Sequence, residues 1–140
     1  MQVTKEGDYA LRAVIYLASA TGRTASANEI SAAQKIPPKF LARIMPKLVR
    51  QGLISSTPGS KGGYKLAREA SQLSFLQVLE AIEGPLRLNV CLEADYGDCE
   101  HETLCSMKSV WSEAQERLAH YFAAITFDQL TEPPCSHKTA

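Results

Sequence analysis

The chain of 140 residues has no apolar run long enough to span a membrane. Its first residues, MQVTKEGDYALR, carry charges and include no cleavable apolar segment, so they do not resemble a secretory signal. Only three histidines are present, and none has an evident nucleophile partner. We therefore expect a cytoplasmic protein that is not an enzyme and has no membrane partner. Its apolar content of 45% is ordinary for one small globular domain with an extension.

Acidic residues are missing from a long central stretch, although the net charge of the whole chain is zero. Residues 35–68 contain no Asp or Glu. Their basic residues are Lys35, Lys39, Arg43, Lys47, Arg50, Lys61, Lys65 and Arg68. Solvated faces usually mix both signs of charge, so a block of one sign favours a polyanion partner over a plain surface. We expect that partner to be double-stranded DNA.

The apolar periodicity of the first third of the chain predicts three helices, at residues 7–20, about 26–34 and 38–51. Ser26 and Glu29 form a capping-box pattern, in which each side chain would bond the other residue's main-chain N–H. A tight break at the two prolines separates the second helix from the third, which is basic. This order is typical of a helix-turn-helix, with the third helix reading DNA.

Two short strand-like runs, at residues 53–57 and 64–67, flank the turn PGSKGG. A Gly-rich basic hairpin directly after a recognition helix predicts a wing that approaches the DNA backbone. From the helix and the wing together we expect the DNA-binding residues to be Lys39, Phe40, Arg43, Lys47, Arg50, Lys61, Gly62 and Tyr64.

The second half of the chain predicts a helix that starts in a capping box at Ser74 and ends near residue 83, and a long helix at 106–125. One apolar stripe of the long helix recurs at spacings of three and four residues, which favours a dimer interface over packing on its own core. The stripe residues that we expect in this interface are Met107, Trp111, Ala114, Leu118, Tyr121 and Ile125.

These elements predict a mainly α fold with a small β-wing. Residues 1–83 would form a winged helix-turn-helix domain, and 106–131 the dimerisation helix with a short terminal turn. Residues 84–105, between them, would form a loop that we expect to bind a metal cluster through its cysteines. We expect residues 132–140 to be a disordered tail in which Cys135 has no role.

The predicted loop contains three cysteines, Cys91, Cys99 and Cys105, separated by seven and five residues. In a reducing compartment such a group favours metal or redox chemistry over disulfides. The closely spaced cysteine pairs of structural zinc sites are absent, and wider gaps favour an iron–sulfur cluster. Three unrelated thiols remain the alternative. Because three thiols leave one ligand missing, His101 and Glu93 are weak candidates for the fourth.

The chain resembles the Rrf-two type of winged-helix transcription regulators, a family that includes the IscR/NsrR-like iron–sulfur regulators. The resemblance covers residues 2 to about 131. It rests on VTKEGDYALRAVIYLA, EISAAQKIPPKFLARIMPKLVRQGLISSTPGSKGGYKLA, AIEGPL, the three cysteines and ITFDQL. It implies a homodimer with crossed long helices and a cluster in the loop before them, whose state sets the affinity for DNA.

The resemblance also suggests a fourth ligand. The cluster-assembly branch uses a His three residues after the last cysteine, where this chain has Lys108, which as a protonated amine cannot bind iron. The nitric-oxide-sensing branch uses an Asp from the other subunit, near the start of the first helix, to complete a [4Fe-4S] cluster. Asp8 stands at that place, which favours [4Fe-4S] and leaves [2Fe-2S] possible. Alternatively, Asp8 only stabilises the helix N-terminus.

Together these features predict a homodimeric transcriptional regulator, typically a repressor, whose binding to a DNA operator depends on a redox- or nitric-oxide-sensitive iron–sulfur cluster. One alternative is a regulator in which the cysteines act as a metal-free thiol switch. A second alternative is a small iron–sulfur or electron-transfer protein whose basic face binds a protein partner.

Overall fold

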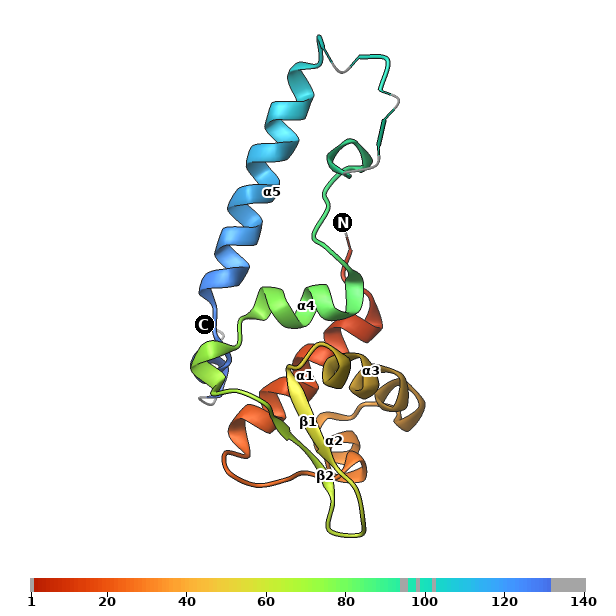
Figure 1. The fold of residues 1–140 in the computed structure, drawn as a ribbon, viewed down its shortest axis with the longest axis vertical. Coiled ribbons are helices and arrows are strands. Elements are labelled where there is room, and N and C mark those ends of the chain that lie inside the picture. The colour runs from red at the N-terminus through yellow and green to blue at the C-terminus, as the bar shows by residue number, and fades with distance from the viewer. Residues whose placement is uncertain (1, 94–95, 98, 102, 132–140) are drawn as a thin grey trace, which may run out of the picture.

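The computed structural model describes residues 2–93, 96–97, 99–101 and 103–131. Its helices and strands are α1 (Lys5–Ser19), α2 (Ala27–Gln34), α3 (Pro38–Arg50), β1 (Ile54–Thr57), β2 (Gly63–Leu66), α4 (Phe75–Glu83) and α5 (Ser106–Ala124). Short 3-10 helices are η1 (Ala70–Gln72), η2 (Val90–Leu92) and η3 (Phe127–Leu130). The first four helices and the hairpin pack together, and α5 rises away from them (Figure 1). The expected class, mainly α with a small β-wing, is confirmed.

Side-chain caps set where α1, α2 and α4 begin, and two of these caps, at α2 and α4, were predicted as capping boxes. Ser74 and Gln77 form the predicted capping box at α4, with both reciprocal hydrogen bonds present. At α2 the Ser26 hydroxyl accepts from the main-chain N–H of Glu29, but the Glu29 carboxylate does not complete the predicted box. It instead accepts from the hydroxyl of Tyr16 at 2.6 Å and pairs with Arg23 at 2.6 Å. A phenol from the last turn of α1 and a cation from the turn that follows α1 thus replace the weaker bond to a main-chain amide.

The turn between α2 and α3 is tight because α2 ends at Lys35 in the left-handed conformation, with φ of 53°. The next residue, Ile36, is buried, and its carbonyl accepts a hydrogen bond from the Ser31 hydroxyl. Pro38 then occupies the first turn of α3, where a missing N–H costs nothing. This geometry produces the predicted helix-turn-helix.

The wing is the antiparallel pair β1 and β2, with Ile54 opposite Leu66. Tyr64 exchanges two 2.8 Å main-chain hydrogen bonds with Ala25, which fixes the hairpin to the segment before α2. A side chain at Gly62 would overlap the carbonyl oxygen of Thr57, so the turn requires glycine there. The wing is therefore held in a defined position beside the helix-turn-helix.

The core is centred on α1 and includes a residue from the far end of the chain. Val14 of α1, Ile44 of α3 and Val78 of α4 are fully buried. Phe127 of η3 is also fully buried, and its main-chain N–H donates to the carbonyl of Leu73 at 3.1 Å. The sequence predicted only a short turn here. The segment that follows α5 thus returns to pack in the core of the first four helices.

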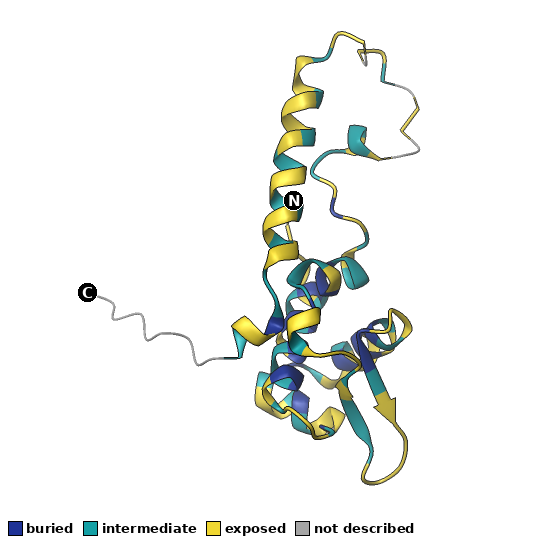
Figure 2. Cartoon of the chain, turned by 60° about the vertical axis from the view of Figure 1, so that its left-hand side comes forward, coloured by how far each residue is buried: buried dark blue, intermediate teal, exposed yellow. Residues whose placement is uncertain are grey.

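Helix α5 has no buried residue, unlike the helices below it. Its Phe122 stacks on Phe75 of α4 with ring centroids 5.0 Å apart, and Gln115 accepts from the main-chain N–H of Leu88. Much of the rest of the helix surface is exposed along its length (Figure 2). In the part of the chain that the structure describes, no helix is long and apolar enough to cross a membrane.

Candidate nucleic-acid interface and cysteine site

Helix α3 divides into a buried and an exposed face. Leu41, Ile44 and Leu48 face the core and are almost fully buried. Lys39, Arg43 and Arg50, three of the predicted DNA-binding residues, are exposed on the other side. The helix therefore presents a cationic surface to solvent, as a recognition helix would.

Two cations of this helix are held by an acid of α1. Glu6 pairs through one carboxylate oxygen with Arg43 Nη2 at 2.8 Å and through the other with Lys47 Nζ at 2.9 Å. The hydrogen bond from Lys47, opposed in part by burial and assisted by the charges of Lys47 and Arg43, lowers the pKa of Glu6. The sequence did not indicate this contact, since 41 positions separate Glu6 from Lys47.

The ring of Phe40 lies beside two exposed cations of α3. This ring packs edge-on against Tyr9 of α1, with centroids 5.3 Å apart. Lys39 and Arg43 lie 5.6 and 5.9 Å from the centre of the same ring, within cation–π range. Phe40 is half-buried, so it can position these cations in addition to any contact of its own with DNA.

The wing residues differ in what they offer to a ligand. Lys61 is exposed at the tip of the hairpin. Gly62 and Tyr64 are half-buried. The turn requires glycine at Gly62, and the main chain of Tyr64 pairs with Ala25. The structure thus gives Gly62 and Tyr64 architectural roles, and their contact with DNA stays a prediction.

The three cysteines of the loop line one small cavity together with Tyr96 and Lys108. Cys91 lies in η2 and Cys105 occupies the position just before α5, so both ends of the loop bring a thiol to the cavity. All three thiols are free and partly buried. Within the described residues, no group of three or more His, Cys, Asp and Glu side chains could hold a single metal ion. Thiolates are the side chains that bind soft metals and iron–sulfur clusters, so the chemistry of these three residues is compatible with such a group.

The other candidate ligands differ in how near they lie to the three cysteines. Asp8 is in the first turn of α1, where its carboxylate pairs with Arg12 at 2.9 Å, and it does not line the cysteine cavity of its own chain. His101 is exposed and lines an adjoining groove together with Trp111 and all three cysteines, Cys91, Cys99 and Cys105. One chain therefore brings together the three cysteines but not Asp8.

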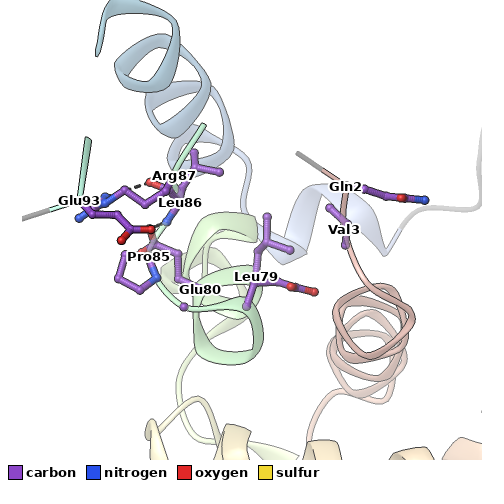
Figure 3. A pocket seen from close by; sticks show the side chains of 10 residues that line it. Gln2, Val3, Leu79, Glu80, Pro85, Leu86, Arg87 and Glu93 are labelled. Atoms are coloured by element: carbon purple, nitrogen blue, oxygen red, sulfur yellow. Dashed lines mark hydrogen bonds between the residues drawn. The ribbon is translucent and has the colours of Figure 1, made fainter. Parts of the chain in front are cut away.

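A cavity of about 480 Å³ lies where the cysteine loop leaves α4 (Figure 3). It is lined by the chain before α1, the last turns of α4 and the segment that follows. Two of its acids are already engaged: Glu80 accepts from the N–H of Leu86 at 2.9 Å, and Glu83 from the N–H of Thr4 at 3.0 Å. The sequence did not predict this junction.

Comparison with known proteins gives consistent results. The family model described as "Rrf2: Iron-dependent Transcriptional regulator" matches residues 3–133. A Mycobacterium tuberculosis protein named as an HTH-type transcriptional regulator is 40% identical over 87 residues, 61% of this chain. The match spans about half, 54%, of that protein. The regulator IscR of Klebsiella pneumoniae is 31% identical over 93% of this chain and 79% of its own length. The structure of CymR, the global cysteine regulator of B. subtilis, superposes with a TM-score of 0.77 at 23% identity, covering 94% of this chain and 96% of CymR.

Proposed function

The chain belongs to the Rrf2 family of transcriptional regulators, and we propose that it is a homodimer whose operator affinity is set by an iron–sulfur cluster bound at Cys91, Cys99 and Cys105. Members of this family are DNA-binding regulators and not enzymes. Acting on DNA, the protein would work in the cytoplasm. The observation that carries the proposal is the convergence of the three thiols on one cavity at the N-terminal end of α5.

The DNA-binding surface of the proposal comprises the exposed face of α3 and the wing. Arg43 and Lys39, near the start of α3, would reach base edges, and Arg50 at its end would meet phosphate. Lys61 at the exposed tip of the wing would follow the sugar-phosphate backbone. The absence of acids from residues 35–68 supports this surface, because a phosphate backbone meets no repelling carboxylate within that stretch.

The dimer of the proposal forms along α5. Met107, Val110 and Tyr121 are each more than 60% exposed, and Trp111 is 39% exposed. Met107, Val110 and Tyr121 lie on one side of the helix, and Trp111 lies between that side and the one where Gln115 and Phe122 contact their own chain. An apolar stripe of this size in water favours association, and a second copy of the same helix would cover it.

The cluster of the proposal would supply a redox- and nitric-oxide-reactive group when bound. Cys91, Cys99 and Cys105 would hold it as thiolates, and Asp8 of the second subunit would be the fourth ligand. A carboxylate is a hard and weak ligand for such iron, so this position would be readily displaced. To reach the cluster, the Asp8 carboxylate has to leave Arg12 of its own helix.

The first turn of α1 offers a route from the loop to the recognition helix. Thr4 in front of it is bonded to Glu83 at the root of the cysteine loop. Glu6 within it is bonded to Arg43 and Lys47 of α3. Movement of Asp8 in the same turn would therefore alter how α3 is held. A few kcal/mol of differential binding is enough for a large change in affinity.

A metal-free thiol switch is the second candidate function. The three thiols are free and share one cavity, so oxidation could join two of them directly. The similar structure of CymR, a cysteine regulator by name, favours keeping this alternative.

Anaerobic purification followed by iron analysis and visible absorption tests the proposal. Serine at Cys91, Cys99 or Cys105 should remove iron and absorption, whereas Cys135→Ser should retain both. The protein is then used to enrich a duplex that it binds from a random DNA library. The affinity for this duplex is measured with the cluster-loaded protein and with the iron-free protein. Equal affinity of the two forms would refute cluster control, and an iron-free protein that responds to oxidant would establish the thiol switch.

A further inference from the structure

We infer that Glu6 restrains two cations of the recognition helix and thereby limits binding to DNA of unrelated sequence. The inference rests on the proposed role of α3 in DNA binding. It makes Glu6, an acid outside the DNA-binding surface, a residue that determines specificity.

The geometry places one carboxylate between two cations. Arg43 and Lys47 are four residues apart on α3, so their side chains lie on the same side of the helix, one turn from each other. Each takes one oxygen of Glu6, at 2.8 and 2.9 Å. The Glu6 side chain is only 17% exposed, whereas Arg43 is 65% exposed. The acid is thus partly shielded from salt, while the guanidinium remains accessible to a ligand.

The restraint is selective within the basic block of residues 35–68. Among the described residues, Arg43 and Lys47 are the members of that block that form ion pairs with an acid. Lys61 at the wing tip, by contrast, is exposed and forms no ion pair in the part of the chain that the structure describes. Lys61 can therefore neutralise a phosphate without first leaving a carboxylate.

The pairing of Arg43 and Lys47 with Glu6 should lower the affinity for random DNA more than the affinity for a cognate site. Binding to unrelated sequence comes almost entirely from phosphates that displace counterions from the duplex. A cation already paired with Glu6 gains less from a phosphate, because it exchanges one anion for another. At a cognate site, the base-edge contacts proposed for Lys39, which Glu6 does not hold, add energy that requires no cation to leave Glu6. Glu6 therefore widens the ratio between specific and non-specific affinity.

Glu6→Gln tests the inference, with Glu113→Gln as the matched control. Glu113 is an acid of α5 that also pairs with an arginine, Arg117, so the control removes the same charge from a pair outside the DNA-binding surface. We expect Glu6→Gln to bind a random-sequence duplex about tenfold more tightly. The slope of log affinity against log salt should steepen by roughly 0.9 for each phosphate gained. Glu113→Gln should match the wild type.

Thermal unfolding and iron content are measured on every variant, so that only folded proteins in the same cluster state are compared. Unchanged or weaker binding of random duplex by folded Glu6→Gln overturns the inference while the proposed function stands. If the wild-type protein binds no duplex at any salt concentration, the proposed function and this inference both fail.

A second measurement compares two lysine variants, first with Glu6 present and then with Glu6 replaced. Lys47→Gln should lower the affinity for random duplex by less than about twofold, because Lys47 is already held by Glu6. Lys61→Gln should lower that affinity more, and it should also reduce the slope of log affinity against log salt by about 0.9, since one phosphate contact is lost. In the Glu6→Gln background the loss from Lys47→Gln should approach that from Lys61→Gln. Equal losses from the two lysines while Glu6 is present would overturn the inference.

Discussion

Glu83 of α4 accepts a hydrogen bond from the main-chain N–H of Thr4 at 3.0 Å and a second one from the Thr4 hydroxyl. Thr4 is the N-cap of α1, and its hydroxyl oxygen also accepts from the N–H of Gly7. Glu83 is the last residue of α4 before the chain turns at Gly84 toward the cysteines. The root of the loop and the first turn of α1 therefore form one hydrogen-bonded unit.

Replacing Glu83 should uncouple the loop from α3. We expect Glu83→Ala to narrow the affinity ratio between the cluster-loaded and cluster-free protein by about fivefold, the low end of typical coupling energies. Glu69→Ala, at an exposed acid ahead of η1, is the control and should leave the ratio unchanged. The measurement is duplex binding by both forms of each variant. An intact ratio in Glu83→Ala would exclude this route.

Variants of Asp8 and Arg12 distinguish the two possible roles of Asp8, cluster ligand or acid that stabilises the N-terminus of α1. If Asp8 is the fourth ligand, Asp8→Ala should accelerate loss of visible absorption under air by about tenfold or more, a loss comparable to that caused by other changes around metal sites. Arg12→Ala removes the partner of Asp8 but keeps the carboxylate, so its cluster should persist. Similar decay of both variants would mean that Asp8 acts only through the ion pair within α1.

The apolar stripe of α5 should tolerate a charge poorly. Val110 is 64% exposed in the single chain, and a lysine buried there by a second subunit would cost about 3 kcal/mol, or roughly 100-fold in dimer affinity. Ser109→Lys introduces the same side chain one position away, on the polar side of the helix. Sedimentation should therefore detect monomers for Val110→Lys and dimers for Ser109→Lys. Dimers in both would place the interface elsewhere.

Stability at low pH should depend on Glu29. The hydrogen bonds from Arg23 and Tyr16 lower the pKa of Glu29 from 4.5 to about 2. A folded-state pKa below the unfolded one adds stability above pH 4.5, and this contribution is lost as pH falls from 4.5 toward 2. Thermal unfolding across this range should show a shallower dependence for Glu29→Gln, with a small loss at neutral pH because the pair is partly exposed. A parallel curve for the variant would contradict the shift.

Local signals predicted most of the elements correctly. The capping box at Ser74, the start of α3 at Pro38 and the glycine-rich wing turn each depend on residues that are close in sequence. The half-formed box at Ser26 shows where such reasoning stops. The Glu29 carboxylate instead accepts a hydrogen bond from the hydroxyl of Tyr16, 13 positions away, and no local pattern indicates that partner.

The sequence by itself determined the helices, the wing, the basic block and the presence of three thiols, because these depend on composition and short-range periodicity. Only the tertiary structure decided that the thiols share one cavity, that Phe127 returns to the core, and that Glu6 holds Arg43 and Lys47. The contacts of Glu6 and of Phe127 join residues far apart in the chain. The Glu6 contacts form because α1 packs against α3, and no pattern within a single helix records that packing.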